Sequence, residues 1–215
     1  MSLLEQLSSQ VGDRSEEANR EAAALCLADP SLLAEIAAGL QSKDAALIGD
    51  CAEVLTMVAQ ERPAWVALYA PALSALLGHK HTRTRWEATH ALALVADLAP
   101  APAVIAPLLP QLAETLRKDK SVIVRDYTVA MLGRYGRTSA DAARAALPLL
   151  QEALTLWDGK QAGRALNALA EVAQRLPSQA AEMRAIGQQY SSHPRSSVSK
   201  AAKQLLKKLA WIEEG

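Results

Sequence analysis

Leucine and proline recur along the chain at a nearly constant distance. A proline followed by leucine two and six positions later occurs at Pro71, Pro110 and Pro148. A second series of leucines lies in the apolar runs that follow, again almost equally spaced: Leu55, Leu92, Leu132, Leu169 and Leu206. The period of both series, roughly 40 residues, lies within the range of stacked repeats, in which each unit buries its apolar face against its neighbours.

The two series keep a constant offset, which predicts two helices in each repeat. A leucine or tyrosine at the end of the first run precedes the leucine of the second run by almost the same distance throughout, as from Leu77 to Leu92. Within the second run apolar residues recur three and four positions apart, as on the buried face of an amphipathic helix. This pattern predicts burial of Cys51, Val54, Leu55 and Val58, and of the equivalent columns that end at Val95, Tyr135, Val172 and Leu209.

Polar clusters mark the turns between the paired helices, at 41–44, 78–81, 117–120, 157–160 and 191–194. Prolines inside the first helices each remove a backbone hydrogen bond and predict a bend, at Pro71, Pro107, Pro110 and Pro148. We therefore expect one domain, 1–215. Its approximate units are 1–40, 41–77, 78–116, 117–154 and 155–190, followed by a cap over 191–215 that contains Trp211.

One stretch resembles a known repeat family. Asp119-Lys-Ser-Val-Ile-Val124-Arg125 enters a second helix with the aspartate, valine and arginine of HEAT repeats, and the unit length and the proline in the first helix agree. The other units depart from this pattern: 81–85 lacks the aspartate, 195–199 lacks the arginine, and two units lack both, so no subfamily follows. The resemblance implies an all-α fold, a right-handed α-solenoid of about five to six HEAT-like helical pairs, whose second helices line a concave face that binds partners.

The second helices also have a predicted exposed ridge opposite their buried columns. We expect a partner to bind along it, through Glu53, Trp86, His90, Asp126 and Asn167. Trp86 is the central residue, because an indole on an exposed ridge leaves apolar area in water unless a partner covers it. In an alternative interpretation the helix phase differs by one position, and Trp86 packs under the preceding loop.

Charge is balanced overall but unevenly distributed. Lys plus Arg and Asp plus Glu are 23 each, whereas residues 1–79 carry a net charge of −7 and residues 80–215 one of +7. Much of the basic excess lies in the turns that enter the second helices, including Lys160, Arg164 and Arg195. Stacking would align these turns as a basic edge, for which we name Lys80, Arg83, Arg85, Lys118, Lys120 and Arg125.

This edge would steer an acidic protein or a nucleic acid toward the ridge, or it would be only a solvated surface. Because the whole chain has no net charge, nucleic acid is the second choice and a protein partner the first. The oligomeric state does not follow from the sequence.

Few residues suggest catalysis or metal binding. Cys26 and Cys51 form no metal-binding or redox pair. Glu87 and His90 have helical ligand spacing, but the chain has no second such pair, which a di-iron site requires. No nucleophile elbow and no glycine-rich phosphate loop occurs. We therefore expect no metal site, no cofactor and no enzyme activity.

One enzyme class remains as the alternative. HEAT-like repeats are also the scaffold of alkylpurine DNA glycosylases, and this resemblance implies aromatic, aspartate and arginine side chains on the concave face. Trp86, Asp126 and either Arg125 or Arg164 supply those residue types, although no stretch matches the motif of that group position by position.

The location of the protein is also an expectation. Glu5 stands where a signal peptide has a basic flank. The longest charge-free stretches, 63–78 and 98–113, each contain prolines and fall short of the roughly 18–20 apolar residues that a membrane span needs. The sequence thus predicts a cytoplasmic, non-catalytic protein-interaction module that does not enter the membrane.

Overall fold

A computed structural model describes the backbone of residues 2–214 and the side chains of residues 2–210. The protein is 78% helical, and no β-strand occurs in the described backbone. The prediction of an all-α repeat solenoid is confirmed. Trp211, which we expected in the terminal cap, lies outside the described side chains.

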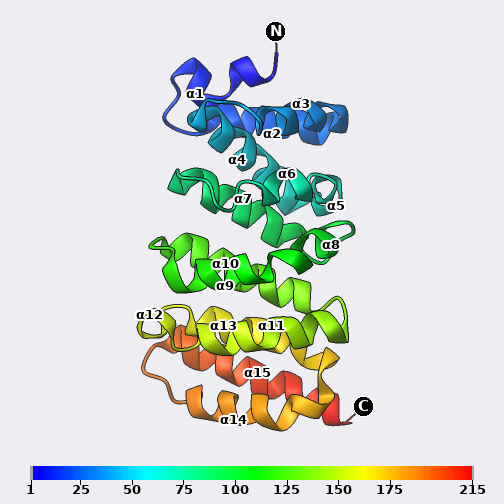
Figure 1. The fold of residues 1–215 in the computed structure, drawn as a ribbon, viewed down its shortest axis with the longest axis vertical. Coiled ribbons are helices and arrows are strands. Elements are labelled where there is room, and N and C mark those ends of the chain that lie inside the picture. Colours follow the sequence, from blue (N-terminus) through cyan, green and yellow to red (C-terminus); the bar gives the residue numbers. More distant parts are fainter. Residues whose placement is uncertain (1, 215) are drawn as a thin grey trace. The chain divides into compact units, whose positions relative to one another are not determined.

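The helices follow one another as Figure 1 shows. They are α1 (Ser8–Val11), α2 (Glu17–Ala28), α3 (Leu33–Gly39), α4 (Ala45–Glu61), α5 (Pro63–Ala67), α6 (Ala70–Ser74), α7 (Thr82–Val95), α8 (Ala101–Ile105), α9 (Leu109–Lys118), α10 (Val122–Gly136), α11 (Ala140–Ala153), α12 (Leu156–Gly159), α13 (Ala162–Val172), α14 (Ala180–Tyr190) and α15 (Ser196–Glu214). The chain divides into two compact units, Met1–Val104 and Ile105–Gly215. That it is a single domain stays a prediction.

The second helices of the repeats are α4, α7, α10, α13 and α15. Two of them begin at a side-chain cap: the carboxylate of Asp44 accepts from the amide of Ala46, and the hydroxyl of Ser121 accepts from the amide of Val124. The predicted core columns are buried in all five helices, except that Leu206 in α15 is half-buried. The period read from the sequence therefore places the core correctly.

In the N-terminal unit α4 is the central helix. It packs against α2, α3, α5 and α7, so that its neighbours cover most of its surface. Residues 8–28 supply part of this cover, because α1 and α2 lie against α4. This cover decides which side chains of α4 reach solvent.

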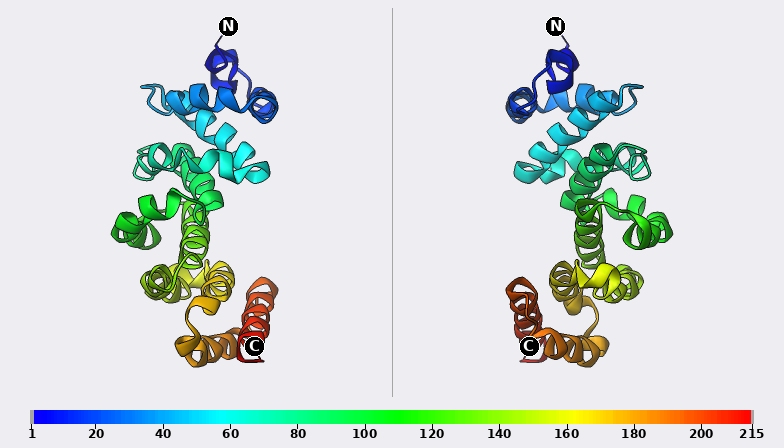
Figure 2. Two further views of the ribbon diagram at one scale, coloured as in Figure 1. Left: turned by 90° about the vertical axis from the view of Figure 1, so that its right-hand side faces the viewer. Right: turned by 90° about the vertical axis from the view of Figure 1, so that its left-hand side faces the viewer.

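In the C-terminal unit α10, α13 and α15 pack side by side in sequence order, and α9, α11 and α14 accompany them. Figure 2 shows α14 and α15 as the last hairpin of this unit. Glycine permits the close approach of α10 to α13, since a Cβ atom on Gly133 would lie 2.8 Å from the Cβ of Ala168. The two backbones therefore come closer than ordinary side chains would allow.

The interior prolines act on the first helices in two ways. The first helix that contains Pro71 is divided into α5 and α6, with Pro71 in the first turn of α6, and a 3₁₀ turn, Ala106–Leu108, separates α8 from α9 around Pro107. Pro148, in contrast, lies inside α11, which continues through it. The predicted interruption thus occurs in two first helices, whereas α11 absorbs its proline.

Candidate functional site

The residues of the predicted ridge differ in their exposure to solvent. Asn167 is exposed, and Trp86, His90 and Asp126 are half-buried. Glu53 is only 6% exposed, so the prediction that it lies on an open ridge is wrong. The reason is the cover over α4, because α2 brings the polar side chain of Asn19 onto the same face of that helix.

Glu53 belongs to a closed polar network. The buried amide of Asn19 donates to Glu53 at 2.6 Å and to Asp50 at 3.1 Å. The guanidinium of Arg83 lies 2.8 Å from each of the same two carboxylates. Burial raises the pKa of Glu53, while Asn19 and Arg83 act in the opposite direction. Two acids from α4 are therefore held by one side chain from α2 and one from α7.

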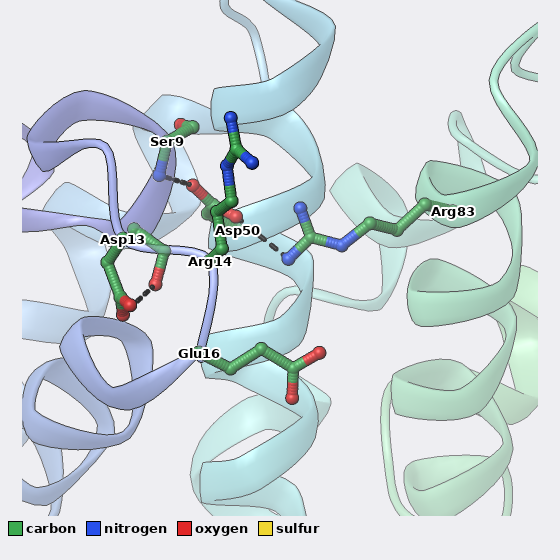
Figure 3. Close-up of a pocket in the computed structure, with 7 residues that line it drawn as sticks. Ser9, Asp13, Arg14, Glu16, Asp50 and Arg83 are labelled. Carbon is green, nitrogen blue, oxygen red and sulfur yellow. Dashed lines mark hydrogen bonds and ion pairs between the residues drawn. The ribbon is translucent and has the colours of Figure 1, made fainter.

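A polar hollow of about 310 Å³ lies beside this network. Figure 3 shows Asp50 between the backbone amide of Ser9 and the guanidinium of Arg83. Asp13, on the rim, accepts hydrogen bonds from Ser15 and from the amide of Ala18, which hold the pKa of its carboxyl well below its usual range. Asp13 and Asp50, two of the acids of this hollow, are thus already bound within the unit.

Trp86 lies beside a second buried acid. Its indole N–H donates to the carboxylate of Glu87, which is 8% exposed. Desolvation of that carboxylate raises its pKa to about 7, and the charge of Glu53 acts in the same direction. Trp86 is therefore half-buried with its polar edge engaged, which lies between the exposed indole we expected and the packed one of the alternative interpretation.

Acids and carbonyl groups of the protein engage several members of the expected basic edge. Arg83 pairs with two carboxylates, Arg85 donates to the carbonyl groups of His79 and Lys80, and Lys118 pairs with Glu114. Lys80 and Lys120 remain exposed. A continuous row of open cations is therefore not formed by these residues.

Arg125 does not lie on an edge at all. It is 1% exposed, and its guanidinium stacks on the ring of Trp157 at 4.1 Å. It also donates to the backbone carbonyl of Asp119 and, at 3.4 Å, to Gln161. The signature arginine of the HEAT resemblance thus joins one repeat to the turn of the next, and our assignment of it to the basic edge is wrong.

The second helices of the C-terminal unit form a different hollow, of about 270 Å³. Two predicted ridge residues, Asp126 and Asn167, line it. The structure adds residues from the turn before α13, from α13 itself and from the start of α15: Lys160, Gly163, Arg164, Arg195, Ser197 and Val198. The basic turn residues that the sequence pointed to therefore lie at the ridge.

Hydrogen bonds position the polar groups of this hollow. Gln161, which is buried, donates to Asp126 at 3.4 Å, and Arg164 lies 3.3 Å from the other oxygen of the same carboxylate. Arg195 donates to the backbone carbonyl of Gly159. Gly159 follows two residues with left-handed backbone, Trp157 and Asp158, at φ values of 54° and 57°. The hollow is thus lined by the first part of α10, by α13 with the turn before it, and by the start of α15.

The described residues hold neither a cluster of metal ligands nor an activated thiol. Among them no group of three His, Cys, Asp or Glu side chains is arranged to hold a metal ion. Burial raises the pKa of Cys26 to about 11 and of Cys51 to about 12, whereas reactive cysteines have lowered values. No helix in the described part of the chain is long and apolar enough to cross a membrane.

Comparison with known sequences gives no family: no protein family and no curated protein matches the chain. Solved structures do match. An engineered protein aligns with a TM-score of 0.74 at 20% identity, over 98% of this chain and 96% of that one. A designed armadillo repeat protein in complex with the peptide (KR)4 aligns with a TM-score of 0.71 at 18% identity, over 96% and 98%.

A third neighbour is described as one of several computationally designed armadillo repeat proteins for modular peptide recognition. It aligns with a TM-score of 0.70 at 18% identity, over 96% of this chain and 98% of that one. At such identities the likeness concerns the fold. The chain is thus similar over nearly its whole length to designed helical repeat proteins.

Proposed function

We propose that the protein is a non-catalytic scaffold that binds an extended peptide segment of a partner protein along its second helices. The observation that carries this proposal is the hollow on α10, α13 and α15, in which Asp126 and Asn167 meet three cationic side chains. Polar groups that converge in a depression supply the oriented contacts that a peptide needs. In the proposed solenoid these helices line the concave face.

The size of the hollow supports surface recognition. Its volume of about 270 Å³ lies just below the range of roughly 300–1,000 Å³ that is typical of small-molecule sites. The thiols are buried, and Asp50 and Glu53 of the N-terminal unit are engaged in structural bonds. A depression that receives one or two side chains of a longer ligand fits these features.

The repeats combine features of two related families. The arginine of α10 and the preceding Asp119 follow the HEAT pattern. The division of two first helices, α5 from α6 and α8 from α9, gives three helices in a repeat, which is typical of armadillo units. We assign the chain to HEAT-like solenoids with a local armadillo character.

Two buried free cysteines fit a reducing compartment such as the cytoplasm.

An array of extended peptides of all charge classes tests the proposed function. We expect the wild-type protein to bind a subset of them, and Asn167→Tyr to weaken binding by at least about tenfold, because the ring fills the hollow without changing its charge. The matched control is Gln111→Tyr, at an exposed position of α9 outside the hollow. An array on which nothing binds, or binding that Asn167→Tyr leaves intact, would contradict the proposal.

A further inference from the structure

We infer that the hollow on α10, α13 and α15 selects an acidic segment, whose carboxylates contact Lys160, Arg164 and Arg195. This inference rests on the proposed function and adds the chemistry of the ligand. The hollow contains three permanent cations and one carboxylate, that of Asp126. Its side chains therefore carry a net positive charge.

The single carboxylate compensates only one of the cations. Asp126 lies 3.3 Å from Arg164 and is also bound by Gln161. Arg195 is held by the carbonyl of Gly159, which carries no net charge, and in the described part of the chain no carboxylate pairs with Lys160. Two positive charges at the hollow are thus not paired with a carboxylate in the described part of the chain.

The surrounding unit strengthens this preference. Residues 105–215 contain 16 Lys and Arg against 10 Asp and Glu, whereas residues 1–104 contain 7 against 13. The summed field of a basic unit raises the local concentration of anionic ligands and their association rate. The (KR)4 peptide bound by the designed neighbour is itself basic, so the charge of this hollow predicts the opposite choice of ligand.

An acidic peptide fits better than a nucleic acid strand. A phosphate backbone is bound by many cations along an extended path, and here Lys118 and Arg117 are paired with acids while Arg125 is buried. Asp126 repels phosphates and peptide carboxylates alike, but a peptide also donates backbone amide hydrogens that a carboxylate can accept. The carboxylate in the hollow therefore has a use with a peptide that a phosphate backbone does not offer.

Fluorescence anisotropy with defined probes tests this inference. The probes are labelled (Glu-Ser)5, (Gly-Ser)5 and (Lys-Ser)5 peptides and a single strand of ten thymidine nucleotides. We expect the acidic peptide to bind at least about tenfold more tightly than the other three, and to weaken as salt screens the charges. Lys160→Glu is expected to reduce its affinity at least about tenfold, and Lys160→Ala less.

The matched pair of variants is Arg164→Glu and Arg144→Glu. Both arginines pair with an aspartate, and their side chains are 53% and 57% exposed, but Arg144 lies on α11 outside the hollow. The inference requires a loss of at least about tenfold for Arg164→Glu and less than about twofold for Arg144→Glu. Equal losses would show attraction to the whole basic unit and would overturn it.

The other outcomes separate the two proposals. If the neutral or basic peptide binds best and Asn167→Tyr abolishes that binding, the peptide scaffold stands and the acidic preference is wrong. If the thymidine strand binds best and depends on Lys160, the ligand is a nucleic acid and both proposals fail. A dimer that Lys160→Glu dissociates in sedimentation would make a second copy of the chain the acidic occupant, again overturning the inference.

Discussion

The two units present the ridge of their second helices in opposite states. On α4 in the N-terminal unit, the ridge residue Glu53 is covered and bound by Asn19 and Arg83. On α10 and α13 in the C-terminal unit, Asp126 and Asn167 line an open hollow with excess positive charge. The position of a ridge residue in its repeat therefore fixes only the helix face on which its side chain lies. Whether the residue reaches a ligand depends on what the rest of the unit lays over it.

The largest expected effect comes from disrupting the closed polar network of the N-terminal unit. In Arg83→Leu the carboxylates of Asp50 and Glu53 lose their cation while buried. Removing one partner of a fully buried pair costs about 3–5 kcal/mol, and because the Arg83 side chain is 37% exposed we expect a loss of about 2–3 kcal/mol in the free energy of unfolding, measured by urea denaturation.

The control for this variant is Arg20→Leu. Its ion pair with Glu17 is exposed on both sides, so we expect a change of less than about 0.5 kcal/mol. If both variants lost the same amount, the network around Asn19 would contribute no more than a surface ion pair, and the contrast between the two units would disappear.

The next effect concerns the packing of α10 against α13 in the C-terminal unit, whose ridge carries the open hollow. Gly133→Ala places a Cβ 2.8 Å from Ala168, so we expect a loss of about 2 kcal/mol from overpacking between α10 and α13. Gly163→Ala is the comparison, because its nearest neighbours would be 3.6 Å away or more and a helix gains from alanine. Denaturation curves in which Gly133→Ala was as stable as Gly163→Ala would contradict the close approach.

The smallest expected effect is the dependence of stability on pH that Glu87 of the N-terminal unit causes. The pKa of Glu87 is raised to about 7 in the folded protein, so between its unfolded value and pH 7 the folded state binds more protons than the unfolded state. Its contribution to stability is therefore full at low pH and lost as pH rises toward 7. We expect a decrease on the order of 1–2 kcal/mol from pH 5 to pH 7.

Glu87→Gln tests this assignment, because an amide cannot ionise and its oxygen can still accept the indole N–H of Trp86. Unfolding free energies measured across this range should depend less on pH than those of the wild type. An unchanged slope would mean that Glu87 is already ionised in the folded protein.

Helix positions and core columns were predictable from the sequence, because the regular leucine period is imposed by neighbours of the same kind. Charge pairing was not, since Asn19, Asp50 and Arg83 lie far apart along the chain and nothing local marks them as partners. Arg125 misled us for a related reason. Its aromatic partner, Trp157, belongs to the turn of the following repeat, so its burial depends on a contact that no helical period contains.

The sequence pointed to the polar residues of the hollow but did not predict that they lie together. Asp126 and Asn167 came from the ridge columns, and Lys160, Arg164 and Arg195 were recognised as basic turn residues, but the two sets were expected on separate surfaces. The left-handed backbone from Trp157 to Gly159 brings them together, because it sets where the turn meets the start of α15.

That short turn has a consequence for the thermodynamics of association. It holds Arg125 from the preceding repeat through Trp157 and Arg195 from the following one through the carbonyl of Gly159. A guanidinium has five N–H donors, so Arg195 can keep this carbonyl and still offer other donors to an incoming anion. This bond restricts the rotation of Arg195 before the ligand arrives, and capture therefore costs less entropy than it would with a freely rotating side chain.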